Sequence, residues 1–395
     1  MKNRNVVFLV LSLLLLVTGC AGKREINELA IVMAVGIDKG DEGNVRVTAQ
    51  IPRPSDARGQ TGAPSGQTGD AIWSVSAEGK TIFEAIRNLG RFSPRRIFWA
   101  HNFIIVINEE FAKTGIQDVI DFFTRNPELR MNTWVAVTPD KAIEVVTTIT
   151  GLEVIPGEAV DKLLRYSAIT SQAPRTTMRN LYSSYLSEGS DPVLTRVKLV
   201  EKGISNKDPG KMKVKQVELA GAGIFKNDKL IGVLEGDEVR GLIPFIERLE
   251  SVILSVSCPK DQSENVSLEL RHQNFKITPG YEDGKPTFHV KLVSYSSIAE
   301  ADCPISLKDK KQVDDMEKEL EELLYNDIKK IVDKVQNEYK ADILRLGEEF
   351  NNKYPSEWKQ LKADWSERLQ DAKIDIEVDA NIKNSVLLYN PTKSN

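Results

Sequence analysis

The sequence predicts a multi-domain protein of mixed α/β and α+β class, in which an N-terminal mixed α/β region is followed by an antiparallel sheet covered by long helices. Its 395 residues, of which 41% are hydrophobic, provide cores for two or three domains. Strand and helix patterns alternate through residues 29–187, whereas residues 214–295 contain mostly strand patterns. Residues 307–370 are highly charged and carry apolar side chains at helical spacing. This order of patterns predicts the two-part architecture.

Residues 1–19 are predicted to be a lipoprotein signal peptide. Lys2 and Arg4 precede an apolar run at residues 6–17, which is shorter than a membrane span and typical of a signal sequence. The run ends in the sequence VTGC, and small residues directly before a cysteine fit a processing site at which Cys20 receives a lipid. Ordinary secretion and an uncleaved anchor are the alternatives. We therefore predict Cys20 as the lipidation site.

The charge of the chain excludes several classes of protein. With 53 basic and 57 acidic residues the formal charge is −4, and loss of Lys2 and Arg4 with the signal lowers it to −6. Binding of nucleic acid requires a basic face, so nucleic acid is not an expected partner. No later segment has the roughly 20 apolar residues of a membrane span. We expect an extracytoplasmic body held at the membrane by its lipid.

Residues 20–200 form the predicted N-terminal mixed α/β region, as one or two subdomains. The apolar run at 29–37 predicts a strand buried on both faces, and alternation at 45–51 predicts a strand with one solvent-exposed face. Residues 58–69 lack core-forming side chains and predict a mobile surface loop. The remaining predicted elements are strands at 72–77, 103–107 and 133–138, and helices at 81–92, 109–123 (broken at Gly115), 140–148 and 156–187 (split near residue 173).

Residues 201–212 are predicted to be a linker, with a long hairpin as the alternative, because they combine charge, glycine and proline without periodicity. The predicted C-terminal domain, residues 213–390, begins with a series of strands. They lie at 214–225, 229–234, 251–256, 266–270 and 288–295, with a helix at 237–249 among them. Strict alternation of apolar and polar residues at 374–378 predicts a last strand in the same sheet.

The long helices at 307–370 are predicted from the spacing of their apolar residues. From Val313 to Phe350 these residues recur every three or four positions, as in one long helix or two helices placed end to end. The sequence SLKD at 306–309 resembles a capping box, and Pro355 begins a further helix. A free coiled coil is the alternative, but strands on both sides leave a sheet for the helices to cover.

Residues that could support catalysis or bind metal do not form a recognisable motif. His101, His272 and His289 are the only histidines, and the His-Glu-x-x-His motif of a zinc site is absent. We interpret them as surface or structural residues. Cys258 and Cys303 form either a disulfide or two buried thiols. No catalytic, metal-binding or cofactor-binding residue is therefore predicted.

Three further features have structural interpretations. Residues 221–223 (GAG) lack the third glycine of a dinucleotide-binding loop and lie in a strand pattern. Trp358 and Trp365 are at helical spacing, which fits a core better than a sugar-binding platform. Four glutamates could contain a glycosidase pair, although a solvated helix face is the simpler interpretation. They are Glu317, Glu319, Glu321 and Glu322. The residues alone thus predict a lipid-tethered binding or assembly protein.

Several segments occur in an order that resembles one known family. They are Gly19-Cys20 followed by 24–32 (REINELAIV) and 36–38 (GID), then 96–101, 112–116 and 121–125, then 221–226 and 228–232, and finally 342–347, 355–358 and Trp365. No single segment is specific, but their order and spacing over nearly the whole mature chain resemble the Ger(x)C family of spore germination lipoproteins.

The resemblance implies one subunit of a nutrient germinant receptor. In that family the lipoprotein works with two integral membrane subunits in the inner membrane of dormant spores, and the complex senses a small-molecule germinant. The family has no established catalytic residues, so only Cys20 is carried over. We expect a non-enzymatic subunit anchored on the outer face of that membrane. A lipoprotein that binds or cleaves cortex glycan, and a solute-binding lipoprotein that captures the germinant, are the alternatives.

Overall fold

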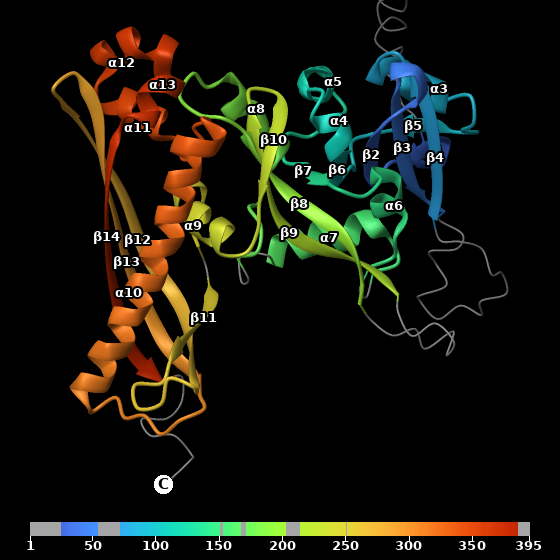
Figure 1. Cartoon of the computed structure of the whole chain (residues 1–395). Helices are drawn as coiled ribbons and strands as arrows, with labels where there is room; N and C mark the ends of the chain where they lie inside the picture. The colour runs from blue at the N-terminus through green and yellow to red at the C-terminus, as the bar shows by residue number, and fades with distance from the viewer. Residues whose placement is uncertain are drawn as a thin grey trace, which may run out of the picture.

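The computed structural model describes residues 25–53, 72–150, 153–166, 171–202, 214–249 and 251–385. They form two large sheets that lie at opposite ends of the molecule, with helices on and between them (Figure 1). Three predicted features lie wholly or mostly outside the described residues: Cys20, the loop at 58–69 and the segment at 201–212.

The first sheet has eight strands. They are β2 (Ala34–Lys39), β3 (Val45–Pro52), β4 (Ile72–Gly79), β6 (Ile104–Asn108), β7 (Trp134–Thr138), β8 (Val193–Glu201), β9 (Lys215–Lys226) and β10 (Lys229–Leu234). Their order is β10-β9-β8-β7-β6-β2-β3-β4. The four central strands are parallel, and antiparallel strands extend the sheet on both sides.

Helices cover both faces of this sheet. One face carries α3 (Ile82–Leu89), α4 (Glu109–Ala112), α5 (Gln117–Arg125) and α8 (Met178–Leu186), and the other carries α6 (Ala142–Thr147) and α7 (Pro156–Tyr166). Val35 and Ile37 of β2 pack on the first face, and Ala34 packs on the second. The strand is therefore buried on both sides, as predicted. The predicted helix break is confirmed at Gly115, whose positive φ of 125° separates α4 from α5.

The apolar run at 29–37 forms two strands and not the single strand expected. β1 (Leu29–Ile31) leaves the first sheet and pairs in parallel with β5 (Arg96–Phe98). The change of partner occurs at two consecutive residues: the Val32 N–H donates to the Phe98 carbonyl, and the Met33 N–H donates to the Gln50 carbonyl. Periodicity predicted the extended backbone but not the partner, because strand pairing is not encoded locally.

The strands at 215–234 belong to the first sheet, which corrects their predicted place in the C-terminal part. β8 and β9 are antiparallel neighbours, and their pairing begins at Glu201 and Lys215. Residues 201–212 therefore join two strands of one sheet, which is the hairpin alternative and not a linker between sheets. The two halves of the chain also share a core, because Ala222, Ile224 and Leu234 pack with residues of the C-terminal helices.

The second sheet has the order β11-β12-β13-β14. Its strands are β11 (Val252–Ser257), β12 (Asn265–Glu282), β13 (Lys285–Ala301) and β14 (Lys373–Ser385). The first three are antiparallel, but β14 pairs in parallel with β13, so the expected fully antiparallel sheet is mixed. The reason is visible in Figure 1: the helix after β13 leads the chain back along the sheet, so β14 starts at the same end as β13.

One long helix and three short ones follow β13, where long helices were expected throughout 307–370. They are α10 (Lys310–Asp333), which continues into a π-helical turn at Lys334–Tyr339, and α11 (Leu346–Lys353), α12 (Pro355–Leu361) and α13 (Trp365–Gln370). The predicted apolar stripe is confirmed on α10, which packs against β14, β11 and α9 (Asp237–Ile246) and is not a free coiled coil. Lys340, with a positive φ of 51°, ends the long helix. The N-cap residue of α10 is Asp309, whose side chain accepts a hydrogen bond from the Lys311 N–H. The predicted capping box, which would make Ser306 the N-cap, is therefore wrong.

Candidate functional site

The three histidines do not share a site. His272 lies opposite Tyr295 on β13 and stacks on its ring, whereas His289 lies opposite Thr278. His272 and His289 therefore do not lie opposite each other. His289 pairs with Glu377 on β14 at 3.0 Å, on the solvent-exposed face of the second sheet. The ring of His101 packs near that of Phe98, in the other half of the molecule. These positions support the structural interpretation.

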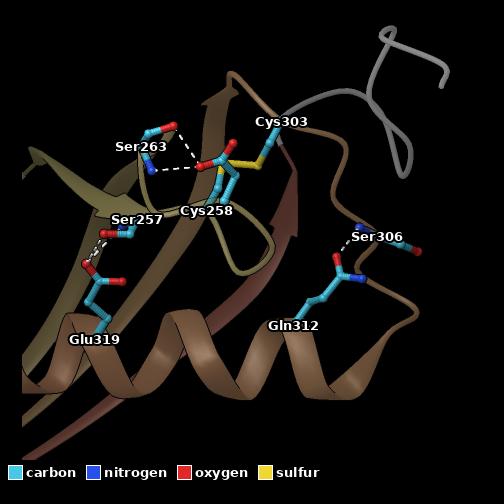
Figure 2. Close-up of a disulfide and its surroundings, with 8 residues drawn as sticks. Ser257, Cys258, Ser263, Cys303, Ser306, Gln312 and Glu319 are labelled. Carbon is cyan, nitrogen blue, oxygen red and sulfur yellow. Dashed lines mark hydrogen bonds between the residues drawn. A yellow bond between two sulfur atoms is a disulfide. The ribbon is translucent and has the colours of Figure 1, made fainter.

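Cys258 and Cys303 form a disulfide, which decides between the two alternatives left by the sequence (Figure 2). Their Cα atoms are 6.4 Å apart, and both residues are buried. Glu264 has a carboxylate oxygen within 4.8 Å of both sulfur atoms. In the disulfide, neither sulfur is the thiolate that a metal ion requires. The bond ties the end of β11 to the segment that leads into α10.

The glutamates of α10 are not a solvated face, which corrects the sequence interpretation. Glu317 accepts from the Ile382 N–H at 2.7 Å, and Glu321 accepts from the Ala380 N–H at 3.1 Å, both on β14. Glu319 accepts from the backbone and hydroxyl of Ser257 on β11 (Figure 2). Glu322 is exposed. Three of the four carboxylates thus hold α10 against strand backbones, a use that does not suit a glycosidase pair.

The two tryptophans belong to the core, as predicted. Trp358 and Trp365 are 4% and 5% exposed, and their rings meet edge to face with centroids 4.9 Å apart. Neither offers a free face for stacking a sugar. Gly221 lies in β9 with a positive φ, and a Cβ there would approach the Leu234 carbonyl oxygen to 1.9 Å. The glycine therefore allows close approach of two strands and does not begin a phosphate-binding loop.

A pair of aspartates, of which Asp342 is buried and Asp191 half-buried, joins the two halves of the chain. Asp342 accepts three hydrogen bonds, from the Leu346 N–H at 3.0 Å, the Gly347 N–H at 2.7 Å and the Trp365 Nε1–H at 2.8 Å. Asp191, in the loop between α8 and β8, accepts from the Asp342 N–H at 2.8 Å, and its own N–H donates to the Asp342 carbonyl. Together they connect the first sheet to the helices that cover the second.

Both carboxyl groups of this junction have raised pKa values. Burial raises the pKa of Asp342 to about 6, against the effect of its three hydrogen bonds, and the nearby charge of Asp191 adds to the rise. Burial also raises the pKa of Asp191. The backbones approach closely beside the pair, because a Cβ on Gly347 would lie 2.7 Å from the Gly189 Cα. The sequence predictions included Asp342 only as part of a segment that resembles the family. The local sign of its buried position is that it is the single acidic residue in the apolar run ADIL at 341–344.

An exposed set of arginines and apolar side chains, which we call the N-terminal patch, lies around the start of the described chain. It consists of Ile26, Arg53, Phe83, Arg87, Arg91, Phe92 and Arg95. A hollow of about 710 Å³ is lined by Ile26, Arg53 and Arg95 among others, and a second hollow of about 360 Å³ is lined by Phe83, Arg87 and Arg95. Arg95 lines both hollows and so joins them, and Arg91 and Phe92 are exposed in the segment between α3 and Arg95. The sequence predictions did not include this patch, although four arginines between residues 87 and 96 signal it.

The acidic side chains and tryptophans described above thus connect helices and strands of the protein itself or fill its core. None of the helices formed by the described residues has the length and apolar character needed to cross a bilayer. The chain matches two family models in order: the spore germination protein N-terminal domain at residues 22–199 and the spore germination B3/GerAC-like C-terminal domain at 220–386. The protein therefore belongs to the Ger(x)C family of spore germination proteins, as the resemblance implied.

Relatives match along nearly the full length of the chain. Spore germination protein KC of Bacillus subtilis (strain 168) is 30% identical over 398 residues, which cover 98% of this chain and 97% of the relative. Spore germination protein B3 of the same organism is 25% identical over 375 residues, covering 93% and 94%. A solved structure described as the crystal structure of the GerBC protein matches with a TM-score of 0.57 and 20% identity, covering 89% of this chain and 97% of that one. This last likeness supports the mixed two-part fold.

Proposed function

We propose that the protein is a non-enzymatic, lipid-anchored subunit of a spore nutrient germinant receptor, located on the outer face of the spore inner membrane. The observation that carries the proposal is similarity to spore germination proteins over the whole length and in the same order. Integral membrane subunits of the receptor are the proposed partners, and a small-molecule germinant is the ligand of the complex.

The lipid anchor is proposed at Cys20. The apolar run and the VTGC sequence support it, and the N-terminal family model begins at residue 22, two positions after this cysteine. Replacing Cys20 by Ala should move the protein from the membrane to the soluble fraction of spore extracts and impair nutrient germination. Lys23→Ala, which leaves the VTGC sequence intact, is the matched control. Unchanged germination with a fully soluble Cys20→Ala protein would show that tethering is dispensable.

The non-enzymatic role is supported by the use that the structure makes of its polar side chains. Three glutamates of α10 hold strand backbones, Asp191 and Asp342 join the two halves, and the tryptophans fill the core. Incubation with muropeptides tests the glycan alternative, and calorimetric titration with amino acids and sugars tests the solute-binding alternative. Cleavage or saturable binding by the isolated protein would contradict the proposal.

Co-purification is the decisive test of receptor membership. The tagged protein should be extracted from spore membranes with mild detergent, and the bound proteins identified by mass spectrometry. We expect two integral membrane subunits in near-stoichiometric amounts. Recovery of the protein alone, under conditions that retain it in the membrane fraction, would refute its assembly with such subunits.

A further inference from the structure

We infer that the N-terminal patch docks on the surface of an anionic phospholipid bilayer and thereby sets the orientation of the protein on the membrane. The inference rests on the proposed lipid anchor for its geometry and concerns a surface formed by the folded chain. The patch lies on and around α3 and β5, at the end of the first sheet that is remote from the second sheet (Figure 1).

The first argument is the position of the patch relative to Cys20. The described chain starts at Glu25, and Ile26, the next residue, lines the larger hollow. Four residues lie between Cys20 and Glu25, so their Cα atoms are five steps apart along the chain and at most about 18 Å apart when fully extended. A lipid on Cys20 would therefore hold Ile26, and with it one side of the hollow that it lines, within about 20 Å of the bilayer surface. A surface at this distance meets lipid headgroups before it meets any soluble partner.

The second argument is charge. Arg53, Arg87, Arg91 and Arg95 are exposed, and within the described part of the chain none of them has an acidic partner. Arg96 differs, because Glu128 neutralises it at 2.6 Å. Guanidinium groups form paired hydrogen bonds with phosphate oxygens, so unpaired arginines suit a phospholipid surface.

Nearby acidic groups reduce this charge. Among them are Asp118 and Asp121, which line a further hollow with Phe83, and of these Asp121 is paired with Arg125. Glu25 and Glu28 are exposed beside Ile26, and Glu84 lies on α3. The carboxylate of Glu84 accepts from the Lys80 N–H at 2.8 Å, at the start of that helix. The lining of the two hollows contains four arginines and one glutamate. In a chain whose formal charge is −4, such a basic concentration is local and complements an anionic surface.

The third argument is the exposure of apolar side chains between the arginines. Ile26 is 75% exposed, Phe92 is 61% exposed and Phe83 is 53% exposed. The Arg87 guanidinium lies over the Phe83 ring, 4.9 Å from its centroid. Aromatic and aliphatic residues flanked by arginines are typical of surfaces that enter the boundary between headgroups and acyl chains. The patch thus adds a second membrane contact to the lipid.

Vesicle binding by the mature polypeptide without its acyl group, residues 21–395, tests the inference. The probe is a vesicle of phosphatidylglycerol and phosphatidylcholine, with pure phosphatidylcholine for comparison, in a flotation assay. We expect binding to the anionic vesicles only, weakening as salt is raised. Because the acyl group is absent, failure here leaves anchoring at Cys20 intact, and the Cys20→Ala experiment leaves the patch intact.

The decisive variant carries Arg87→Glu, Arg91→Glu and Arg95→Glu. Each basic residue near an anionic surface contributes a several-fold increase in binding, so the three changes should weaken vesicle binding on the order of 100-fold or more. Lys260→Glu, Lys276→Glu and Lys285→Glu make the same change of charge on exposed, unpaired lysines of the second sheet and its loops, and should have little effect. Equal thermal unfolding midpoints would show that both variants are folded.

A further variant, Phe83→Ser with Phe92→Ser, keeps the charge and should also weaken binding. The inference is overturned if the unacylated chain does not bind anionic vesicles, or if the arginine and lysine variants bind equally. It is also overturned if the arginine variant binds vesicles normally but no longer co-purifies with membrane subunits from spores. That result would make the patch a protein interface.

Discussion

Replacing Asp342 by Asn should change how the stability of the protein depends on pH. The pKa of this buried carboxyl is raised from 3.8 to about 6. Below about pH 4 the folded and unfolded states both hold the proton, whereas between about pH 4 and 6 only the folded state holds it. The contribution of Asp342 to stability is therefore greatest at low pH and is lost as the pH rises through about 6.

The size of the effect follows from the shift. At about 1.4 kcal/mol per unit of pKa, the change from 3.8 to about 6 corresponds to about 3 kcal/mol, and Asp342 is too deeply buried for solvent to reduce it strongly. An asparagine cannot ionise, so the variant lacks this pH dependence. Its single acceptor oxygen also cannot serve all three donors, Leu346, Gly347 and Trp365, which costs about 1–3 kcal/mol at any pH.

Urea unfolding followed by tryptophan fluorescence provides the measurement, because Trp365 donates directly to Asp342. The free energy of unfolding of the wild type minus that of Asp342→Asn should fall by about 2–3 kcal/mol between pH 4 and pH 7.5. Asp364→Asn, which removes an exposed carboxylate between α12 and α13, is the control. A difference that stays constant, or that grows as the pH rises, would refute the assigned role of burial.

Three further predictions concern stability and can be measured by urea or thermal unfolding. Replacing Cys258 and Cys303 together by Ala should lower the free energy of unfolding by about 2–4 kcal/mol, and reductant should then have no further effect. Arg196→Met should cost about 3–5 kcal/mol, because it leaves the largely buried carboxylate of Glu109 without its partner, whereas the second partner, Glu235, is exposed; a change below about 1 kcal/mol would contradict this. Gly347→Ala should cost about 1–3 kcal/mol because its Cβ would press on Gly189, whereas a neutral effect would mean that the two backbones separate easily.

The sequence predicted most elements of the fold because their periodicity is local. Alternation identified β3 and β4, and the stripe that starts at Val313 identified α10. Periodicity did not predict β8. It also did not predict the second half of β12, because residues 271–282 carry polar side chains on both faces and include Pro279. It could not place β9 and β10, since the partner of a strand depends on residues far away in the chain.

The sites were predicted unevenly for a similar physical reason. Trp358 and Trp365 were assigned to the core because apolar spacing reports burial directly. The roles of Glu317 and Glu321 could not be read from α10, since their hydrogen-bond donors are backbone groups of β14, more than fifty residues later. The pairing of the two cysteines likewise depends on distance in space, which spacing in sequence does not give.

The parallel pairing of β14 with β13 has a consequence for the order of synthesis and folding. Thr287 pairs with Lys373, so β13 can pair with β14 only after the intervening helices have been synthesised. The carboxylates of Glu317 and Glu321 likewise receive their donors only from this last strand. A chain that stops before residue 373 would leave one edge of β13 open to other chains. Nascent or truncated chains that lack β14 should therefore be more exposed to aggregation and proteolysis than chains that contain it.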